Sequence, residues 1–160
     1  MSDDVLVQAL RYNRWANLRL LEVCSELSEE QLQLASPGTY GSIAATWQHL
    51  LAAEQRYLRR LAGFEPQISE KDDFPGIATL REHAERSGDA LISAVGRFDP
   101  EETSVGGDSR VKHWLVMTQA IHHGNDHRTH ICTILGQNGL SYGDLDVWAF
   151  GTDNGGYEAC

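Results

Sequence analysis

Apolar residues recur along most of this chain at intervals of three and four positions, the spacing that keeps them on one face of an α-helix. Long runs that alternate between apolar and polar residues, as in a half-buried strand, are missing from the sequence. The pattern predicts four long helices, over residues 3–27, 42–61, 77–98 and 111–135, and a short fifth helix over residues 144–150.

Polar and helix-ending residues indicate where these helices begin and end. Ser28 followed by Gln31 resembles a capping box and predicts one short turn after the first helix. Ser42 is placed to cap the second helix, and Asp99-Pro100 ends the third. The connections are predicted as a polar loop over residues 63–75, an extended excursion or a small hairpin over residues 101–110, and a frayed tail over residues 151–160.

The number of helices and the length of the chain define the expected fold class. Four long helices with connections of roughly 10–15 residues are typical of an antiparallel-type helical bundle. A length of 160 residues suits one domain with a sizeable core, and the sequence contains no internal repeat. Hydrophobic residues make up 41% and charged residues 22%, a globular composition. We therefore expect an all-α fold in a single domain over residues 1–160.

The charge and the amino-terminal sequence narrow the classes of partner. The formal net charge of −10 repels phosphate backbones, and the lysines and arginines are dispersed, so nucleic-acid binding is disfavoured. No apolar stretch approaches the ~20 residues needed to cross a bilayer. The acidic start lacks the order of a secretory signal. We expect a cytoplasmic protein without a membrane partner.

The cysteines do not indicate a disulfide or a thiolate metal site. Cys24, Cys132 and Cys160 are an odd number at wide spacing, and no Cys-x-x-Cys motif occurs. We expect them to be reduced, with Cys24 and Cys132 behaving as small core residues.

The strongest chemical signal is a pair of histidines in the fourth predicted helix. His123 and His127 are four residues apart, which places two imidazoles on one helix face, about 6 Å apart at Cβ. That spacing allows both to bind one metal ion. His49, in the second predicted helix, is the best candidate for a third ligand if the two helices pack side by side. Three imidazoles with an open coordination position are typical of a reactive site.

Other interpretations of the histidines stay open. The chain has seven histidines, so a pair four residues apart also arises by chance. His130 is close to His127 in helical projection and competes as a ligand. The zinc-peptidase motif requires glutamate directly after the first histidine, and Gly124 occupies that position. Metalloprotease chemistry is therefore disfavoured.

Several motifs, in their order and spacing, resemble the DinB family over nearly the whole chain. They are Tyr12-Asn13-Arg14-Trp15-Ala16-Asn17, residues 43–49, His123-x-x-x-His127-Arg128, and Leu135-Gly136 before Asp144-Leu-Asp146. The resemblance implies an up-up-down-down four-helix bundle with a long crossover and a short helix at the C-terminal end, commonly a homodimer. It also implies a divalent metal held by His49, His123 and His127. Many relatives read His-Arg-Gly-Gln where this chain has His127-Arg128-Thr129-His130, so His130 alters the site or adds a ligand.

The resemblance also implies a class of activity. Better-understood relatives look like metal-dependent transferases or isomerases that use low-molecular-weight thiols such as bacillithiol, mycothiol or glutathione. It implies a thiol-dependent S-transferase acting on small electrophiles in detoxification or stress response, with zinc or nickel as the metal. A divalent ion on three neutral imidazoles stabilises a bound thiolate or a bound hydroxide, and both need the same open coordination position. A noncatalytic metal-binding dimer and a metal-dependent hydrolase are therefore the alternatives.

Two residues of the first helix are candidates for substrate binding. If that helix lines the site, Asn13 and Arg14 would hold a substrate carboxylate, since an arginine fork suits such a group. The alternative is that Arg14 pairs with a carboxylate on a neighbouring helix. Arg128 lies on the inner face of its helix and is expected to anchor a buried ion pair or an interface.

Overall fold

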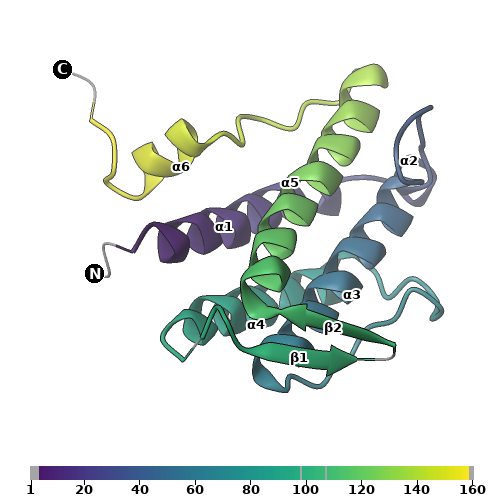
Figure 1. Cartoon of the computed structure of the whole chain (residues 1–160). Helices are drawn as coiled ribbons and strands as arrows, with labels where there is room; N and C mark the ends of the chain where they lie inside the picture. The colour runs from purple at the N-terminus through teal and green to yellow at the C-terminus, as the bar shows by residue number, and fades with distance from the viewer. Residues whose placement is uncertain (1–3, 98, 107, 159–160) are drawn as a thin grey trace.

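The computed structural model describes residues 4–97, 99–106 and 108–158, and most of them are helical (Figure 1). The elements in chain order are α1 (Val5–Ser25), α2 (Glu29–Leu32), α3 (Ile43–Ala62), α4 (Ile77–Val95), β1 (Thr103–Gly106), β2 (Ser109–Lys112), α5 (His113–Gln137) and α6 (Val147–Asp153). Among the described residues, no helix has both the length and the apolar character of a membrane span.

The predicted helix boundaries follow from capping chemistry. The ends of α1, α3 and α5 lie within two residues of the predicted positions. Ser28 and Gln31 form the predicted capping box, which starts the single turn of α2. The Ser42 hydroxyl accepts a hydrogen bond from the Ala45 amide at 3.2 Å and caps α3, as predicted. α3 ends at Gly63, whose φ of 65° is the left-handed conformation that glycine adopts most readily.

β1 and β2 pair antiparallel, which confirms the small hairpin that was one of the two expectations for residues 101–110. With these two strands the fold is mostly helical rather than all-α. Two predictions about helix ends also need correction. α4 ends at Val95, before the predicted residue 98. α6 starts at Val147 rather than at residue 144, because the Asp146 side chain caps it by accepting a hydrogen bond from the Ala149 amide at 2.8 Å. It extends to Asp153, over residues that were expected to be a frayed tail. The parts of the predictions that concern residues 3, 98, 107, 159 and 160 lie outside the described residues.

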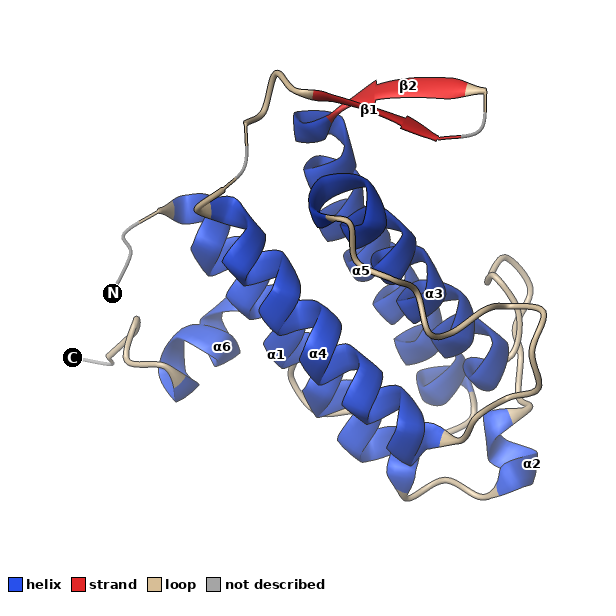
Figure 2. Cartoon of the chain, turned by 90° about the horizontal axis from the view of Figure 1, so that it is seen from below, coloured by secondary structure: helices blue, strands red, loops and turns tan. Residues whose placement is uncertain are grey.

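Two apolar clusters show which way each long helix runs. The long helices themselves are drawn in Figure 2. The larger cluster includes Leu20, Trp47, Leu80 and Ile131, from the C-terminal halves of α1 and α5 and the N-terminal halves of α3 and α4. The smaller cluster is built around Leu10, Leu58, Leu91 and Met117, from the opposite halves of the same helices. α1 and α5 therefore run in one direction, and α3 and α4 run in the other. This up-down-down-up order corrects the expected up-up-down-down order.

A single long connection produces this order. α3 and α4 are consecutive and parallel, so the chain returns along the helices between them. Side chains of α3 hold the returning loop. Gln55 Oε1 accepts a hydrogen bond from the Gln67 amide at 2.7 Å. Gln48 Nε2 donates to the carbonyls of Ser69 and Asp72 at 2.8 and 2.9 Å. An up-up-down-down order requires two such crossovers, whereas the other connections here join neighbouring helix ends.

A buried polar network links the four long helices between the two apolar clusters. Arg128 Nη1 on α5 donates to Asn13 Oδ1 at 2.8 Å and to Asn17 Oδ1 at 2.7 Å, both on α1. Asn13 Nδ2 donates to Glu54 Oε2 on α3 at 3.1 Å, and the Ser87 hydroxyl on α4 donates to Glu54 Oε1. Burial raises the pKa of Glu54, against the effect of these donors and of the Arg128 charge. Asn13 thus connects a buried carboxyl group to a buried guanidinium.

Gly124 provides a test of this network, because a Cβ there would stand 2.2 Å from Asn13 Oδ1. We expect Gly124→Ala to lower the free energy of unfolding by about 1–3 kcal/mol, since the methyl group would crowd a buried, hydrogen-bonded side chain. Gly136→Ala in the same helix is the matched control, because the nearest atom there, Tyr142 Cε1, is 3.7 Å away. The control should raise the free energy of unfolding by about 0.5–1 kcal/mol. Urea unfolding followed by circular dichroism measures both variants, and equal effects would exclude crowding as the cause.

Candidate metal centre

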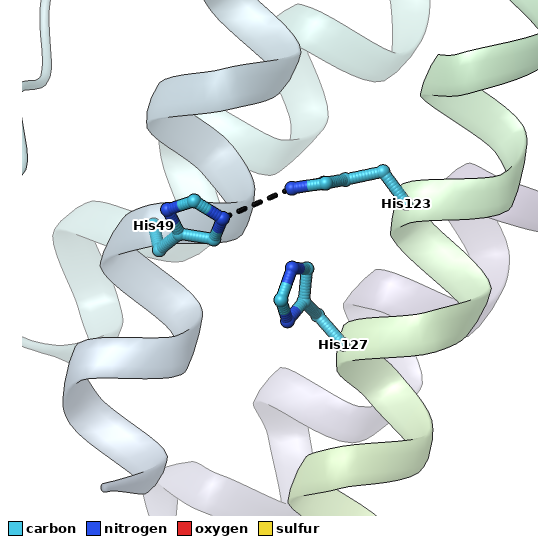
Figure 3. A group of neighbouring side chains, drawn as sticks. All are labelled: His49, His123 and His127. Atoms are coloured by element: carbon cyan, nitrogen blue, oxygen red, sulfur yellow. Dashed lines mark hydrogen bonds between the residues drawn. The ribbon is translucent and has the colours of Figure 1, made fainter. Parts of the chain in front are cut away.

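Three imidazoles from two antiparallel helices meet between α3 and α5 (Figure 3). His49 comes from α3, and His123 and His127 come from successive turns of α5. One nitrogen from each ring lies within 4.8 Å of the other two. The ring centroids are 4.3 to 5.0 Å apart, and His49 Nε2 lies 3.0 Å from His123 Nε2. The structure therefore brings together the three residues that the sequence singled out as metal ligands.

The rotation of α5 about its axis directs these side chains towards α3. Gly124 and Arg128 each follow one of the histidines by one position, which is a rotation of about 100° on a helix. Both contact Asn13 on α1. The face of α5 that carries Gly124 and Arg128 is therefore turned towards α1. The positions directly before them, His123 and His127, are turned towards α3 and His49.

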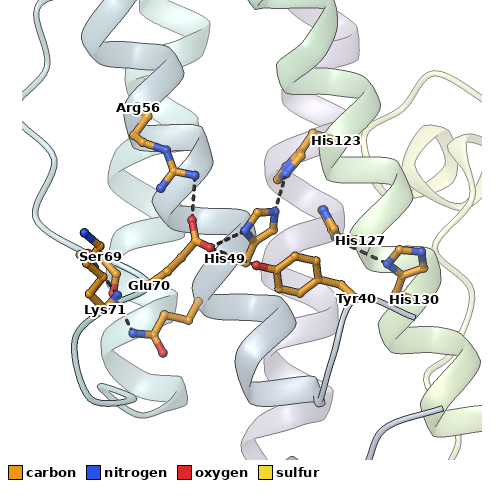
Figure 4. A network of polar contacts seen from close by, with 10 residues as sticks. Tyr40, His49, Arg56, Ser69, Glu70, Lys71, His123, His127 and His130 are labelled. Atoms are coloured by element: carbon orange, nitrogen blue, oxygen red, sulfur yellow. Dashed lines mark hydrogen bonds and ion pairs between the residues drawn. The ribbon is translucent and has the colours of Figure 1, made fainter. Parts of the chain in front are cut away.

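Glu70, in the loop between α3 and α4, fixes the orientation of His49 (Figure 4). His49 Nδ1 lies 2.8 Å from Glu70 Oε2. A carboxylate only accepts hydrogen bonds, so Nδ1 carries the proton and Nε2 directs its lone pair to the other histidines. Arg56 Nη2 lies 2.8 Å from Glu70 Oε1, and the Tyr40 hydroxyl donates to Oε2 at 3.0 Å. Burial favours a higher pKa for Glu70, but these three donors lower it to about 2.

His130 lies behind His127 rather than beside the other two rings. Its Nδ1 is 3.3 Å from His127 Nδ1. The other nitrogen of His127 points towards His49 and His123 (Figure 3). A proton on His127 Nδ1, donated to His130, leaves His127 Nε2 free to bind a metal. His130 Nε2 is in turn 4.0 Å from Asp126 Oδ1, and Asp126, His127 and His130 form a second group of closely spaced donors.

Aromatic rings pack against the histidine cluster, and the pKa values of His123 and His127 are lowered. The Tyr40 ring stacks on His49 with centroids 3.9 Å apart, and the Tyr57 ring meets His123 edge-on at 5.7 Å. The pKa of His123 is lowered to about 4, first by burial and then by His127 and His49. The pKa of His127 is also lowered to about 4, first by burial and then by His49. Both rings are therefore neutral near pH 7, as metal ligands must be.

This donor set fits a divalent transition metal. The Glu70 contact selects the His49 tautomer that a metal ligand requires. Imidazole nitrogens suit zinc, nickel, copper and iron alike, so the donors do not select one of them. Three protein donors in a group leave a position for an external ligand.

Asn13 and Arg14, the predicted substrate-binding residues, take part in helix packing. Asn13 is 1% exposed, and its amide contacts Glu54 and Arg128. Arg14 Nε lies 2.8 Å from Asp89 Oδ1 on α4, which is the ion pair that the sequence offered as the alternative. The role of these two residues towards a substrate stays a prediction.

Three residues that surround the site were not among the sequence candidates. Glu70 belongs to a loop, where helical periodicity gives no information about direction. Tyr40 precedes α3 and is likewise outside any helix. Arg56 offered a signal, because it follows His49 by seven residues and so lies on the same face of α3.

Comparison with known proteins gives a family match and a structural likeness. The model of the DinB family matches residues 1–153. A crystal structure of a DinB-like protein from Bacillus cereus ATCC 10987 is similar with a TM-score of 0.69, over 87% of this chain and 94% of that chain, at 18% sequence identity. At this identity the likeness shows a shared fold. None of the curated proteins compared with the chain matches it significantly.

We expect the purified protein to bind about one equivalent of a divalent transition metal per chain. His123→Ala should remove most of this metal, because it deletes one of three converging nitrogens. His122→Ala is the matched control, since this neighbouring side chain is exposed and should leave occupancy unchanged. Elemental analysis of protein prepared without a histidine tag measures both. Full occupancy in His123→Ala would show that the ligand assignment is wrong.

Glu70→Gln should weaken metal binding by about tenfold or more, because a neutral amide is a weaker acceptor for His49 and loses the ion pair with Arg56. Glu65→Gln, an exposed change in the same loop, should have no effect. Competition with a chromogenic chelator gives both affinities. If the two variants bind metal equally well, the carboxylate does not support the site.

Proposed function

The chain belongs to the DinB family, and we propose that it is a metal-dependent enzyme that transfers small electrophiles to a low-molecular-weight thiol. The observation that carries this proposal is the convergence of His49, His123 and His127, since a metal held by three protein donors keeps a coordination position for an external ligand. A divalent transition metal supplies positive charge that favours the deprotonated form of a thiol near neutral pH.

The residues around the histidines hold the site ready for this chemistry. Glu70 keeps the proton of His49 on Nδ1. His130 Nδ1 is placed to accept a hydrogen bond from His127 Nδ1, which would leave His127 Nε2 for the metal. The Tyr40 ring covers one face of His49 and excludes water from it. In the reaction, the thiol sulfur forms a bond to the electrophilic carbon, the leaving group departs with its electron pair, and the thiol proton passes to solvent.

The described cysteines are poorly suited to be the nucleophile, which supports an external thiol. Burial raises the pKa of Cys24 to about 11, and Trp47 Nε1 lies 3.3 Å from its sulfur. Burial also raises the pKa of Cys132 to about 11. Near pH 7 both are protonated thiols with little reactivity. Cys160 lies outside the described residues.

Glu70 is poorly placed to be the general base of a metal hydrolase, because both of its oxygens are engaged. A metal hydrolase needs a general base that can take a proton from water. Glu70 accepts hydrogen bonds from His49 and Tyr40 on one oxygen and pairs with Arg56 through the other. It is therefore engaged in holding the site.

We place the activity in the cytoplasm, where low-molecular-weight thiols stay reduced, with a role in detoxification or stress response.

A noncatalytic metal-binding homodimer is the second candidate. α6 leaves Val147 and Trp148 60% and 70% exposed, and apolar surface of this kind is often buried between subunits. In this alternative the ion and the helix packing organise an interaction surface.

A thiol panel distinguishes the two candidates. Metal-loaded protein is mixed in turn with bacillithiol, mycothiol and glutathione and with a chromogenic electrophile. We expect thioether formation with one of the thiols, lost in His123→Ala and kept in His122→Ala. Loss of the electrophile without thioether would indicate hydrolysis. If metal is bound and no thiol reacts, S-transfer is excluded and the homodimer is favoured.

A further inference from the structure

α3 carries a second group of charged residues beyond the histidine cluster. Arg56, Arg59 and Arg60 lie in its last two turns and, with Ser104, Val105 and Gly106 of β1, line an open hollow of about 620 Å³. The chain as a whole has a net charge of −10 and only 13 lysines and arginines. Three arginines in one hollow therefore reverse the sign of the charge locally.

The arginines are only partly neutralised by the protein. Arg60 Nη2 donates to the Gly106 carbonyl at 3.3 Å and to the Ser109 hydroxyl at 3.0 Å. Its Nη1 is buried and has no hydrogen-bond partner among the described residues. Arg59 is exposed and takes part in none of the ion pairs found in the described part of the chain. Arg56 alone contacts a carboxylate, that of Glu70.

The hairpin holds the Arg60 guanidinium in a fixed place. Gly106 allows the guanidinium to lie against the backbone of β1, since a Cβ there would stand 2.9 Å from Arg60 Cζ. A guanidinium that is already held by neutral acceptors keeps its full charge and loses little further freedom when it binds an anion.

The arginines of the hollow follow His49 along the same helix. His49, Arg56 and Arg60 are spaced by seven and four residues and share one face of α3. With a rise of about 1.5 Å per residue, Arg56 lies about 10 Å and Arg60 about 16 Å from His49 along the helix. Arg56 also contacts the carboxylate that holds His49 (Figure 4). A molecule the length of a few extended residues, at about 3.3 Å each, spans this distance.

We propose that Arg56, Arg59 and Arg60 form an anion subsite that binds the carboxylate or phosphate groups of a small-molecule substrate whose reactive end lies at the histidine cluster. The inference rests on the proposed function and narrows its substrate class to anionic thiols or anionic electrophiles. Arginine forks match the planar geometry of such groups.

A purely structural role for the same residues makes a different prediction. Arg59 and Arg60 lie in the last turn of α3, where cations stabilise the helix terminus. In that role their replacement would lower stability and leave ligand affinity unchanged.

Calorimetry on metal-loaded protein tests the subsite without requiring turnover. The probes are glutathione and its diethyl ester, which carries the same thiol without the two carboxylates. We expect glutathione to bind about tenfold more tightly than the ester at low salt, with a smaller difference at about 0.5 M salt. A second arm uses a carboxylate-bearing aryl halide and its ester, so that the two arms show whether the thiol or the electrophile carries the recognised group.

Variants then assign the preference to the arginines. Arg59→Gln should reduce the preference for the acid about fivefold or more. Arg60→Lys keeps the charge and loses the fork, and it should reduce the preference by a smaller factor. Arg97→Gln, an exposed change after α4, is the matched control. Circular dichroism and metal content establish that each variant is folded and loaded.

The outcomes separate this inference from the proposed function. If both arms show equal binding of acid and ester, or if Arg59→Gln and Arg60→Lys keep the full preference, the subsite is excluded, even for a protein that transfers thiols. If the acids bind preferentially through these arginines and no S-transfer occurs with any thiol, the subsite stands and the proposed function fails.

Discussion

A buried guanidinium places strict demands on the helices around it, because its charge must be balanced and its N–H groups hydrogen-bonded. In this chain Arg128 meets those demands through Asn13 and Asn17, and through Asn13 it is connected to Glu54 and Ser87. The contacts involve all four long helices, so they fix how the helices are rotated and how far each lies along its neighbours. The histidines depend on that fixing, since His123 and His127 lie next to the residues that contact Asn13.

The loop between α3 and α4 has two roles. Its hydrogen bonds to Gln48 and Gln55 return the chain along the helices, which makes α3 and α4 parallel. The same loop supplies Glu70, which selects the tautomer of His49. The order of the helices and the chemistry of the candidate metal centre therefore depend on one segment.

Much of this arrangement could be predicted from the sequence, and the reasons for the exceptions are physical. Helical periodicity located the long helices, and the spacing of His123 and His127 required only local geometry. The direction of α4 depends on side chains that hold a loop, and periodicity carries no information about such contacts. Glu70 could not be predicted for the same reason. The buried place of Asn13 was missed because its partners, Glu54 and Arg128, come from two other helices, far apart in the sequence.

Glu70 reaches His49 from an irregular, partly exposed segment and not from the packed helices. Substitutions or insertions there change the surroundings of a metal ligand without creating a cavity or a clash in the interior. Evolution, or a protein engineer, can therefore adjust the reactivity of such a centre by editing surface sequence alone, while the scaffold that supports it is left untouched.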